Sequence, residues 1–482
     1  MCTNAETIAI EDSYFIDGQG RQRLFNGLNM VCKSSAYGYV YPLSPADYQK
    51  LSHSGINLLR FGIFWTAIEP EPGVFDDAYL RRVKEQLEYA HKAGISFFLD
   101  FHQDLYGVAF GPEAPSWADG APAWATITDG LPHIAGDLWS DAYLISPALN
   151  RAFEHFWNND PVCGLGLQEH YARMLRHTAK FFRGMPGLLG YDLWNEPYPG
   201  PAGQEALNEV MGQLPGAVDL SREEEKARLM AGLTDMDVYR GLAEAISRHT
   251  MPFEQKRLMA FYERSAEAIH EEDPHAFVFT EPCYFTNLGV PSGIGGLSVP
   301  GQVFAPHGYD IVVDTGHDDL FNPGRVELIF RRHKETGERL GIPTVIGEWG
   351  AFGGRPGNEE AGTQMISILE KNLWSHTYWC WTEDIASLPE WRLLVRAYPV
   401  AVAGRLRSYH WDGNAFEMEY DAVPGVTEIF VPGLAKREWE TDIPQGNADV
   451  EAEGWNDTGH GILHITTEKT QRMQIRIHMS GD

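Results

Sequence analysis

The sequence has few cysteines, a deficit of basic residues and no long hydrophobic run. Five cysteines in 482 residues form no CxxC pair, which excludes a disulfide framework or a zinc ribbon and leaves at most one incidental disulfide. No apolar run approaches the roughly 18 residues that a membrane-spanning helix needs. With 38 Lys and Arg against 67 Asp and Glu, the formal charge is −29, so charge alone does not attract nucleic acid or anionic bilayers.

Motifs for cofactors and metals are also missing. No glycine-rich phosphate loop stands between a strand and a helix, no helical HExxH motif occurs, and Asp310–Asp319 does not match a spaced calcium loop. We therefore expect no cofactor and no metal. Residues Met1–Ser13 lack a basic stretch followed by an apolar one, so no signal peptide is visible. We expect a monomer that is cytoplasmic, or secreted if an export signal has been removed.

Short apolar runs alternate with amphipathic helical patterns between residues 24 and 394. This alternation is typical of a parallel sheet, and eight runs indicate a (β/α)8 barrel, assigned to residues 1–398. The expected strands are Leu24–Met30, Ile56–Phe64, Ile95–Phe101, Leu188–Trp194, Ala276–Thr280, Gln302–Pro306, Pro343–Gly347 and His376–Trp381. After the second, Asp76 or Asp77 should cap a helix with an apolar stripe that ends at Gly94.

Two insertions and a change of pattern complete the organisation. Residues 104–159 and 198–251 are too long for ordinary barrel loops and follow strand C-termini, where barrels place their active sites. Ser221–Ser247 is helical in pattern. From residue 399 to 482, apolar and polar residues alternate with period two, which predicts an antiparallel β-sandwich.

Two expected strands end in a glutamate. Tyr191–Pro197 reads Tyr-Asp-Leu-Trp-Asn-Glu-Pro and Thr344–Gly350 reads Thr-Val-Ile-Gly-Glu-Trp-Gly, which places Glu196 and Glu348 at the same end of the barrel. Glycoside hydrolysis usually requires two carboxyl groups that face the same cleft. About 5 Å apart they act with retention, and about 6.5–9.5 Å apart with inversion.

These motifs resemble glycoside hydrolase family 5. In that family the Asn-Glu-Pro glutamate is the acid/base and the strand-seven glutamate is the nucleophile, and the resemblance implies these roles for Glu196 and Glu348. It extends to further residues at strand ends, which it implies in substrate binding: Arg60, His102, Asn195, His307, Tyr309 and Trp381.

A narrower resemblance is to the endoglycoceramidases. It rests on Gly27–Lys33, Asp100–Gly107, Ala114–Ala118 and Thr128–Pro132, together with the terminal sandwich. It implies a retaining endo-β-glycosidase that hydrolyses the β-glycosidic bond between a glycan and ceramide. It also implies that Lys33 and Asp104 bind the first sugar. The alternatives are a β-glucosidase or diglycosidase acting on steryl, flavonoid or other glycosides, and an inactive carbohydrate- or lipid-binding barrel.

The residues themselves suggest individual roles. Arg60 should keep Glu348 ionised, because a nearby cation favours a carboxylate, and Tyr309 could donate to Glu348. Asn195 is placed to bond the sugar 2-hydroxyl. Trp379 and Trp381 share the eighth strand, and we expect Trp381, at the mouth, to be the indole platform under the sugar and Trp379 to be core.

A glycolipid substrate would require contact with a micelle or bilayer. Because the chain is acidic, apolar side chains near the mouth would have to supply the attraction. The insertions offer six candidates: Trp117, Trp124, Leu131, Val210, Met211 and Leu214.

Overall fold

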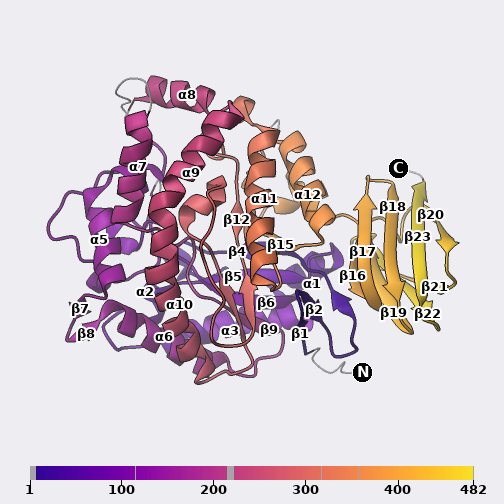
Figure 1. The fold of residues 1–482 in the computed structure, drawn as a ribbon. Helices are drawn as coiled ribbons and strands as arrows, with labels where there is room; N and C mark the ends of the chain where they lie inside the picture. The colour runs from indigo at the N-terminus through magenta and orange to yellow at the C-terminus, as the bar shows by residue number, and fades with distance from the viewer. Residues whose placement is uncertain (1–6, 114–115, 214–221, 316, 356–357, 481–482) are drawn as a thin grey trace.

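The computed structural model describes residues 7–113, 116–213, 222–315, 317–355 and 358–480, which form a barrel with a smaller β domain at its side (Figure 1). Eight parallel strands pair in the order β11-β10-β9-β6-β5-β4-β15-β13, and a parallel bridge between Phe304 and Thr344 closes the ring. The strands are β4 (Asn26–Met30), β5 (Leu58–Ile63), β6 (Ser96–Phe101), β9 (Leu188–Asp192), β10 (Phe277–Thr280), β11 (Gln302–Phe304), β13 (Val345–Ile346) and β15 (Ser375–Tyr378). All eight predicted strands are confirmed.

Helices surround this ring (Figure 1). They are α1 (Pro45–His53), α3 (Asp77–Lys92), α6 (Leu167–Phe182), α10 (Met259–His270), α11 (Pro323–Leu340), α12 (Glu359–Asn372) and the short α13 (Trp391–Leu394). In α3 the predicted cap is confirmed, because Asp76 Oδ1 accepts the N–H groups of Ala78 and Tyr79 at 2.8 and 3.1 Å. The fifth strand departs from the pattern, since the 3-10 turn η5 (Tyr284–Leu288) follows it where a long helix is usual.

The interior of the barrel has an apolar lower layer and a charged upper layer. Phe98 of β6 and Phe279 of β10 stack at a centroid distance of 4.1 Å in the lower layer, among other buried apolar side chains of the barrel strands. Arg60 of β5, Asp100 of β6 and Asp192 of β9 are all fully buried in the upper layer. A filled lower layer of this kind is usual in such barrels, and it leaves polar chemistry to the C-terminal ends of the strands.

Both insertions are structured. The first contains α4 (Asp141–Ile145) and α5 (Pro147–Asn158), and the second contains α7 (Pro201–Gln213), α8 (Glu223–Gly232) and α9 (Met236–Phe253). The helical pattern expected over Ser221–Ser247 is confirmed in its described part, with an interruption between α8 and α9. In Figure 1, α7, α8 and α9 stand at one end of the barrel.

The smaller domain is an antiparallel β-sandwich, as predicted. One sheet has the order β17-β18-β23-β20, from Gly404–Trp411, Ala415–Ala422, Gln471–Ser480 and Glu438–Gln445. The other combines β16 (Tyr398–Val402), β19 (Gly425–Val431), β22 (Gly461–Thr467) and β21 (Asp449–Gly454) with three strands from the start of the chain. Side chains such as Met418 and Ile475 of the first sheet and Ile429 and Leu463 of the second share one core.

The strands from the start of the chain are β1 (Ala9–Glu11), β2 (Tyr14–Ile16) and β3 (Gln22–Arg23), and β3 pairs with β16. The barrel expected over residues 1–398 includes these residues, whereas in the structure they extend the sheet of the sandwich. Short strands and a polar turn give no signal that identifies a partner almost 380 residues away. The boundary at residues 398 and 399 stays a prediction.

Candidate active site

Arg60 lies at the centre of the charged layer. It stands directly opposite Asn29 in the pairing of β4 and β5, and its Nη1 donates to Asn29 Oδ1 at 3.0 Å. Its Nε donates to Asp192 at 2.9 Å, and its Nη2 lies 2.9 Å from Asp100. A fully buried guanidinium needs such partners, because an unpaired buried charge is strongly destabilising.

Glu348 receives two donors on different oxygens. Arg60 Nη1 donates to Oε1 at 2.6 Å, and the hydroxyl of Tyr309 donates to Oε2 at 2.7 Å. The strand β14 (Glu348–Trp349) pairs with β12 (His307–Gly308), which places His307 directly beside Glu348. The charge-assisted bond from Arg60 and the phenolic O–H of Tyr309 fix the orientation of the Glu348 carboxyl group, which suits a nucleophile.

Glu196 is buried and receives both of its side-chain donors on one oxygen. Asn287 Nδ2 donates to Oε1 at 2.6 Å, and His307 Nδ1 lies 2.9 Å from the same atom. Burial raises the pKa of Glu196 to about 7, with help from the charges of Glu348 and Asp104 and against the opposing effect of His307. A carboxyl group with this pKa holds a proton up to neutrality, as a general acid must.

The two glutamates lie close enough for double displacement. One oxygen of each, together with a nitrogen of His307, lies within 4.8 Å of the others. Retaining glycosidases hold their carboxyl groups about 5–5.5 Å apart, whereas inverting enzymes need about 6.5–9.5 Å to fit a water molecule. The separation therefore favours retention.

Asn195 is fixed beside this pair. Its Oδ1 accepts from Arg60 Nη2 at 2.8 Å, and its Nδ2 donates to the carbonyl oxygen of Gln103 at 2.9 Å. The amide thus has a set orientation next to Glu196. Its contact with a sugar 2-hydroxyl stays a prediction.

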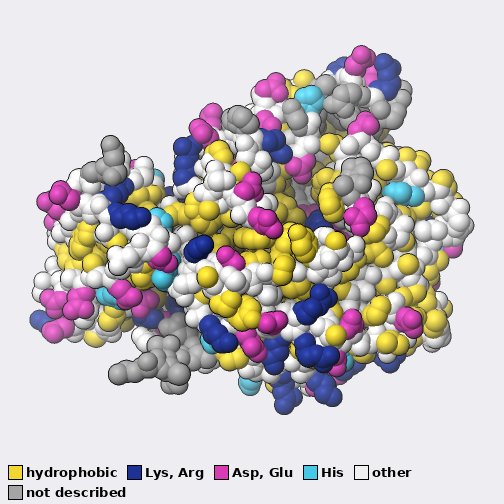
Figure 2. Space-filling model, turned by 180° about the vertical axis from the view of Figure 1, so that it is seen from behind, with side chains coloured by type: hydrophobic (Ala, Val, Ile, Leu, Met, Phe, Trp, Pro, Cys, Tyr) yellow, Lys and Arg dark blue, Asp and Glu magenta, His cyan; other side chains and the backbone are white. Residues whose placement is uncertain are grey.

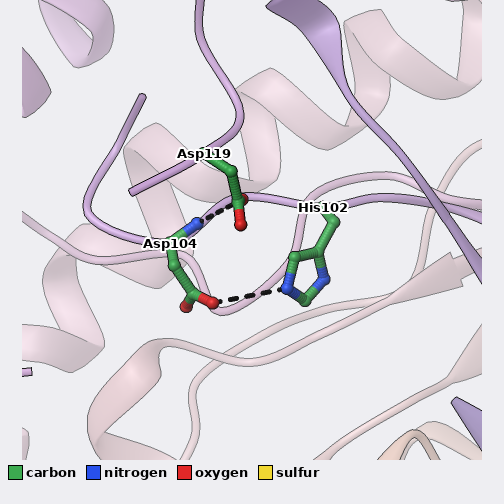
Figure 3. Close-up of side chains that lie close together, drawn as sticks. All are labelled: His102, Asp104 and Asp119. Carbon is green, nitrogen blue, oxygen red and sulfur yellow. Dashed lines mark hydrogen bonds and ion pairs between the residues drawn. The ribbon is translucent and has the colours of Figure 1, made fainter. Parts of the chain in front are cut away.

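A second polar cluster adjoins the glutamates. Figure 3 shows His102, Asp104 and Asp119 pointing toward one another, with Asp119 Oδ1 accepting the backbone N–H of Asp104 at 2.9 Å. Lys33 forms an ion pair with Asp104 and lies 3.7 Å from Asp119 Oδ2. Although burial opposes it, the ammonium of Lys33 holds the pKa of Asp104 at about 2, while burial raises the pKa of Asp119 to about 7.

The charges in this cluster also bear on metal binding. The three groups of His102, Asp104 and Asp119 bring ligand-type atoms within 4.8 Å, but the ammonium of Lys33 already supplies positive charge to both carboxylates. Arg60 does the same for Asp100 and Asp192. Each of these two clusters thus already contains a basic side chain among its carboxylates. In the acidic segment after the sixth strand, Asp310 is buried and accepts from Arg325 Nη2 at 2.7 Å.

The two tryptophans that follow β15 differ from expectation. Trp379 is only half-buried, stacks on His102 at a centroid distance of 5.3 Å, and has Lys33 Nζ 5.1 Å from its ring centre. The interpretation of Trp379 as core was therefore wrong. Trp381 packs against Tyr41 at 4.7 Å, and its role as a sugar platform stays a prediction. Period-two geometry gave no way to rank the two indoles.

Some site residues were missed by the sequence analysis. Glu281 immediately follows β10 and contacts Arg60, so the same pattern of a carboxylate after an apolar strand would have found it. Asn287 belongs to the 3-10 turn η5 and Asp119 to a loop. Trp139, whose ring centre lies 5.8 Å from Lys33 Nζ, comes from the first insertion. No periodicity in the sequence points to residues of this kind.

Family comparisons match both parts of the chain. The family described as "Cellulase (glycosyl hydrolase family 5)" matches residues 19–384, and the "Glycoside hydrolase family 5 C-terminal domain" matches residues 396–478. The first of these covers most of the chain, including both glutamates.

Individual relatives span nearly the whole chain. Endoglycoceramidase I of Rhodococcus hoagii (strain 103S) is 26% identical over 99% of this chain and 89% of its own length. The solved ganglioside GM3 complex of endo-glycoceramidase II from Rhodococcus sp. has a TM-score of 0.76 and 26% identity, covering 98% of this chain and 100% of that one. The lactosyl-enzyme intermediate of the same enzyme has a TM-score of 0.74, 26% identity, and coverage of 97% and 100%.

Proposed function

Since this chain belongs to glycosyl hydrolase family 5, we propose that it is a retaining endo-β-glycosidase that hydrolyses the bond between the glycan and the ceramide of glycosphingolipids. The main support for this reaction is the closeness of Glu196 and Glu348, which have one oxygen each within 4.8 Å of the other. Glu348 accepts from Arg60 and Tyr309, whereas Glu196 accepts from Asn287 and lies beside His307. The relatives named above support the substrate, because each of them is an endoglycoceramidase that aligns with nearly the whole chain at 26% identity.

The geometry supports a double displacement. Glu348 attacks the anomeric carbon while Glu196 transfers its proton to the glycosidic oxygen, so that the ceramide hydroxyl leaves and a glycosyl ester forms. Glu196, now ionised, takes a proton from water, which attacks the same carbon and releases the glycan and Glu348. Because Asn287 and His307 both bond Oε1 of Glu196, its Oε2 is the oxygen suited to carry the proton.

The second cluster supports the recognition of sugar hydroxyls. Lys33 offers donors and Asp104 offers acceptors at one place, beside the faces of Trp139 and Trp379. Charged hydrogen-bonding groups next to aromatic faces suit a sugar ring, which has polar edges and an apolar face. We assign this cluster to the sugar next to the cleaved bond.

We also propose that the mouth of the barrel contacts a lipid surface. Trp117, Leu131 and Ile134 in the first insertion are 41%, 39% and 43% exposed. Hydrophobic side chains also gather across the middle of the face in Figure 2, with acidic and basic side chains around them. Each Å² of apolar surface buried contributes about 25 cal/mol, so apolar contact can attract a protein that charge does not.

The earlier candidates for this contact need revision. Trp124 packs edge-to-face on Trp65 and donates to the carbonyl oxygen of Glu69 at 3.1 Å, and Val210 is buried. Both are therefore structural. Met211 is half-buried, and Leu214 lies outside the described residues. No described helix is long and apolar enough to cross a membrane.

The decisive experiment is incubation with a panel of glycosphingolipids, with the products identified by mass. Release of the intact oligosaccharide together with ceramide is the expected result. Stepwise release of monosaccharides would instead support a β-glucosidase, and binding with no product would support an inactive barrel.

A further inference from the structure

A third carboxylate, Glu281, connects the two glutamates. It follows β10, is buried, and its two oxygens have different partners. Oε2 accepts the backbone N–H of Glu196 at 2.8 Å. Oε1 lies 2.8 Å from Arg60 Nη2 and 3.2 Å from His307 Nε2.

The bond to the backbone of Glu196 matters because that backbone is strained. Glu196 has a φ of 44°, in the left-handed region that residues with a side chain rarely adopt. Such a conformation persists only where surrounding contacts hold it. The Glu281 carboxylate is one such contact, and it is itself anchored, because the hydroxyl of Tyr262 on α10 donates to the Glu281 carbonyl oxygen at 2.8 Å.

The contact with His307 acts on the side chain of Glu196. A carboxylate that faces Nε2 keeps a proton on that nitrogen and favours the doubly protonated imidazolium, so that Nδ1 also donates. Nδ1 is the nitrogen that lies 2.9 Å from Oε1 of Glu196. Glu281 thus acts on both the backbone and the carboxyl group of the same residue.

We propose that Glu281 is a positioning residue that aims the Glu196 carboxyl group at the leaving oxygen, through the Glu196 amide and through His307. This inference rests on the proposed function, in which Glu196 is the acid/base. The charged groups around Glu281 are Arg60 from β5, Asp100 from β6, Asp192 from β9 and His307 from β12. Although burial opposes it, the charges of His307 and Arg60 hold the pKa of Glu281 below its ordinary value, so it remains a carboxylate.

The test compares two aryl β-lactosides that differ in their need for an acid. Phenol is a poor leaving group and needs a proton, whereas 2,4-dinitrophenol leaves without one. In Glu281→Gln the amide nitrogen replaces one of the two carboxylate oxygens. It must then face either the Glu196 N–H or Arg60 and His307, and in both cases two hydrogen-bond donors point at each other. We expect kcat/KM to fall by about 100-fold on the phenyl substrate, within the range of general acid catalysis, and by less than about fivefold on the dinitrophenyl substrate.

Equal losses on both substrates would overturn the inference, because they would mean that Glu281 acts on the nucleophile or on the fold. Should Glu281→Gln melt at a lower temperature, Glu281→Asp, which keeps the charge, provides a second measurement, and it should show the same preference to a smaller extent. Turnover of either substrate by the wild-type protein tests the proposed function separately, whatever the variants do.

Glu254→Gln is the matched control. Glu254 is also fully buried, and its Oε1 accepts the N–H of Cys283 at 2.7 Å, two residues beyond Glu281. If neutralising a buried carboxylate merely disturbs the segment after β10, kcat/KM should fall by the same factor on the phenyl and the dinitrophenyl lactoside. A leaving-group preference in Glu254→Gln as large as that in Glu281→Gln would also overturn the assignment.

Discussion

Asn287 and Glu196 are joined by a hydrogen bond of 2.6 Å from the amide to Oε1. Because His307 approaches the same oxygen, two donors stabilise one side of the carboxyl group and leave the other oxygen for the proton. The acid therefore has a fixed direction as well as a raised pKa.

The first prediction concerns pH. Glu196 must be protonated in the first step, and burial raises its pKa to about 7, so kcat/KM for a poor leaving group should fall as pH rises through about 7. Glu196→Gln should lose this basic limb on the same poor substrate, whereas on a dinitrophenyl glycoside, which needs no proton, neither protein should show it. A basic limb that persists in Glu196→Gln would mean that another group donates the proton.

The second prediction separates the roles of the two glutamates. Glu196→Ala and Glu348→Ala should each lower turnover by about 10²–10⁴-fold or more, with little change in melting temperature. Azide should restore activity on an activated aryl glycoside. The product should be the β-glycosyl azide with Glu196→Ala and the α-glycosyl azide with Glu348→Ala. The reverse stereochemistry would exchange the two roles.

The third prediction compares the two indoles that follow β15, those of Trp379 and Trp381. Trp379 faces Lys33 and His102, so Trp379→Ala should lower kcat/KM on an aryl lactoside by about 10- to 100-fold, which corresponds to losing about 1.5–3 kcal/mol of aromatic contact. Trp381→Ala, which removes packing on Tyr41, is the control and should mainly lower the melting temperature. A larger catalytic loss from Trp381→Ala would restore the platform role that the sequence suggested.

The fourth prediction concerns stability in acid. Burial lowers the pKa of His333 from 6.5 to about 3, and its Nε2 donates to the His307 carbonyl oxygen. Below pH 6.5 the unfolded chain binds a proton that the folded chain excludes. The stability due to this histidine is therefore complete above pH 6.5 and decreases as the pH falls toward 3, by about 1.4 kcal/mol per pH unit.

His333→Gln keeps a donor for that carbonyl oxygen and removes the titration. The free energy of unfolding is measured with urea at pH 7.5 and at pH 5.5. The loss between these two pH values should be about 1 kcal/mol smaller in the variant than in the wild type. Parallel losses in both proteins would show that His333 does not contribute to acid sensitivity.

The fifth prediction tests the contact with lipid. Replacing Trp117, Leu131 and Ile134 with serine should raise KM for a ceramide-linked substrate in micelles severalfold and leave KM for a soluble aryl lactoside unchanged. Val423→Ser is the matched control, because Val423 is 42% exposed but lies beside β18 in the sandwich. A rise in KM on both substrates, or an equal effect of the control, would assign these residues a structural role.

The strands could be predicted from the sequence because a barrel strand is buried on both faces. Its residues are therefore mostly apolar and stand out as a short apolar run. Glu196 and Glu348 were found for the same reason, since each directly follows such a run. Glu281 also comes directly after an apolar strand, but no motif comparable to those around Glu196 and Glu348 marks it in the sequence. Residues such as Asn287 and Asp119 reach the site through loop conformations, which local sequence patterns do not encode.

The pairing of β3 with β16 has a consequence for how the protein forms. Residues 22–23 pair with residues 15–16 on one side, but on the other side only with residues 401–402, so during synthesis that side of β3 stays unpaired until most of the chain has been made. Contacts of such separation slow folding, because a long loop must close before they contribute. A chain that is cut before the sandwich leaves β1–β3 with an open edge, and its barrel should aggregate or require a chaperone, whereas co-expression with the missing segment should rescue it.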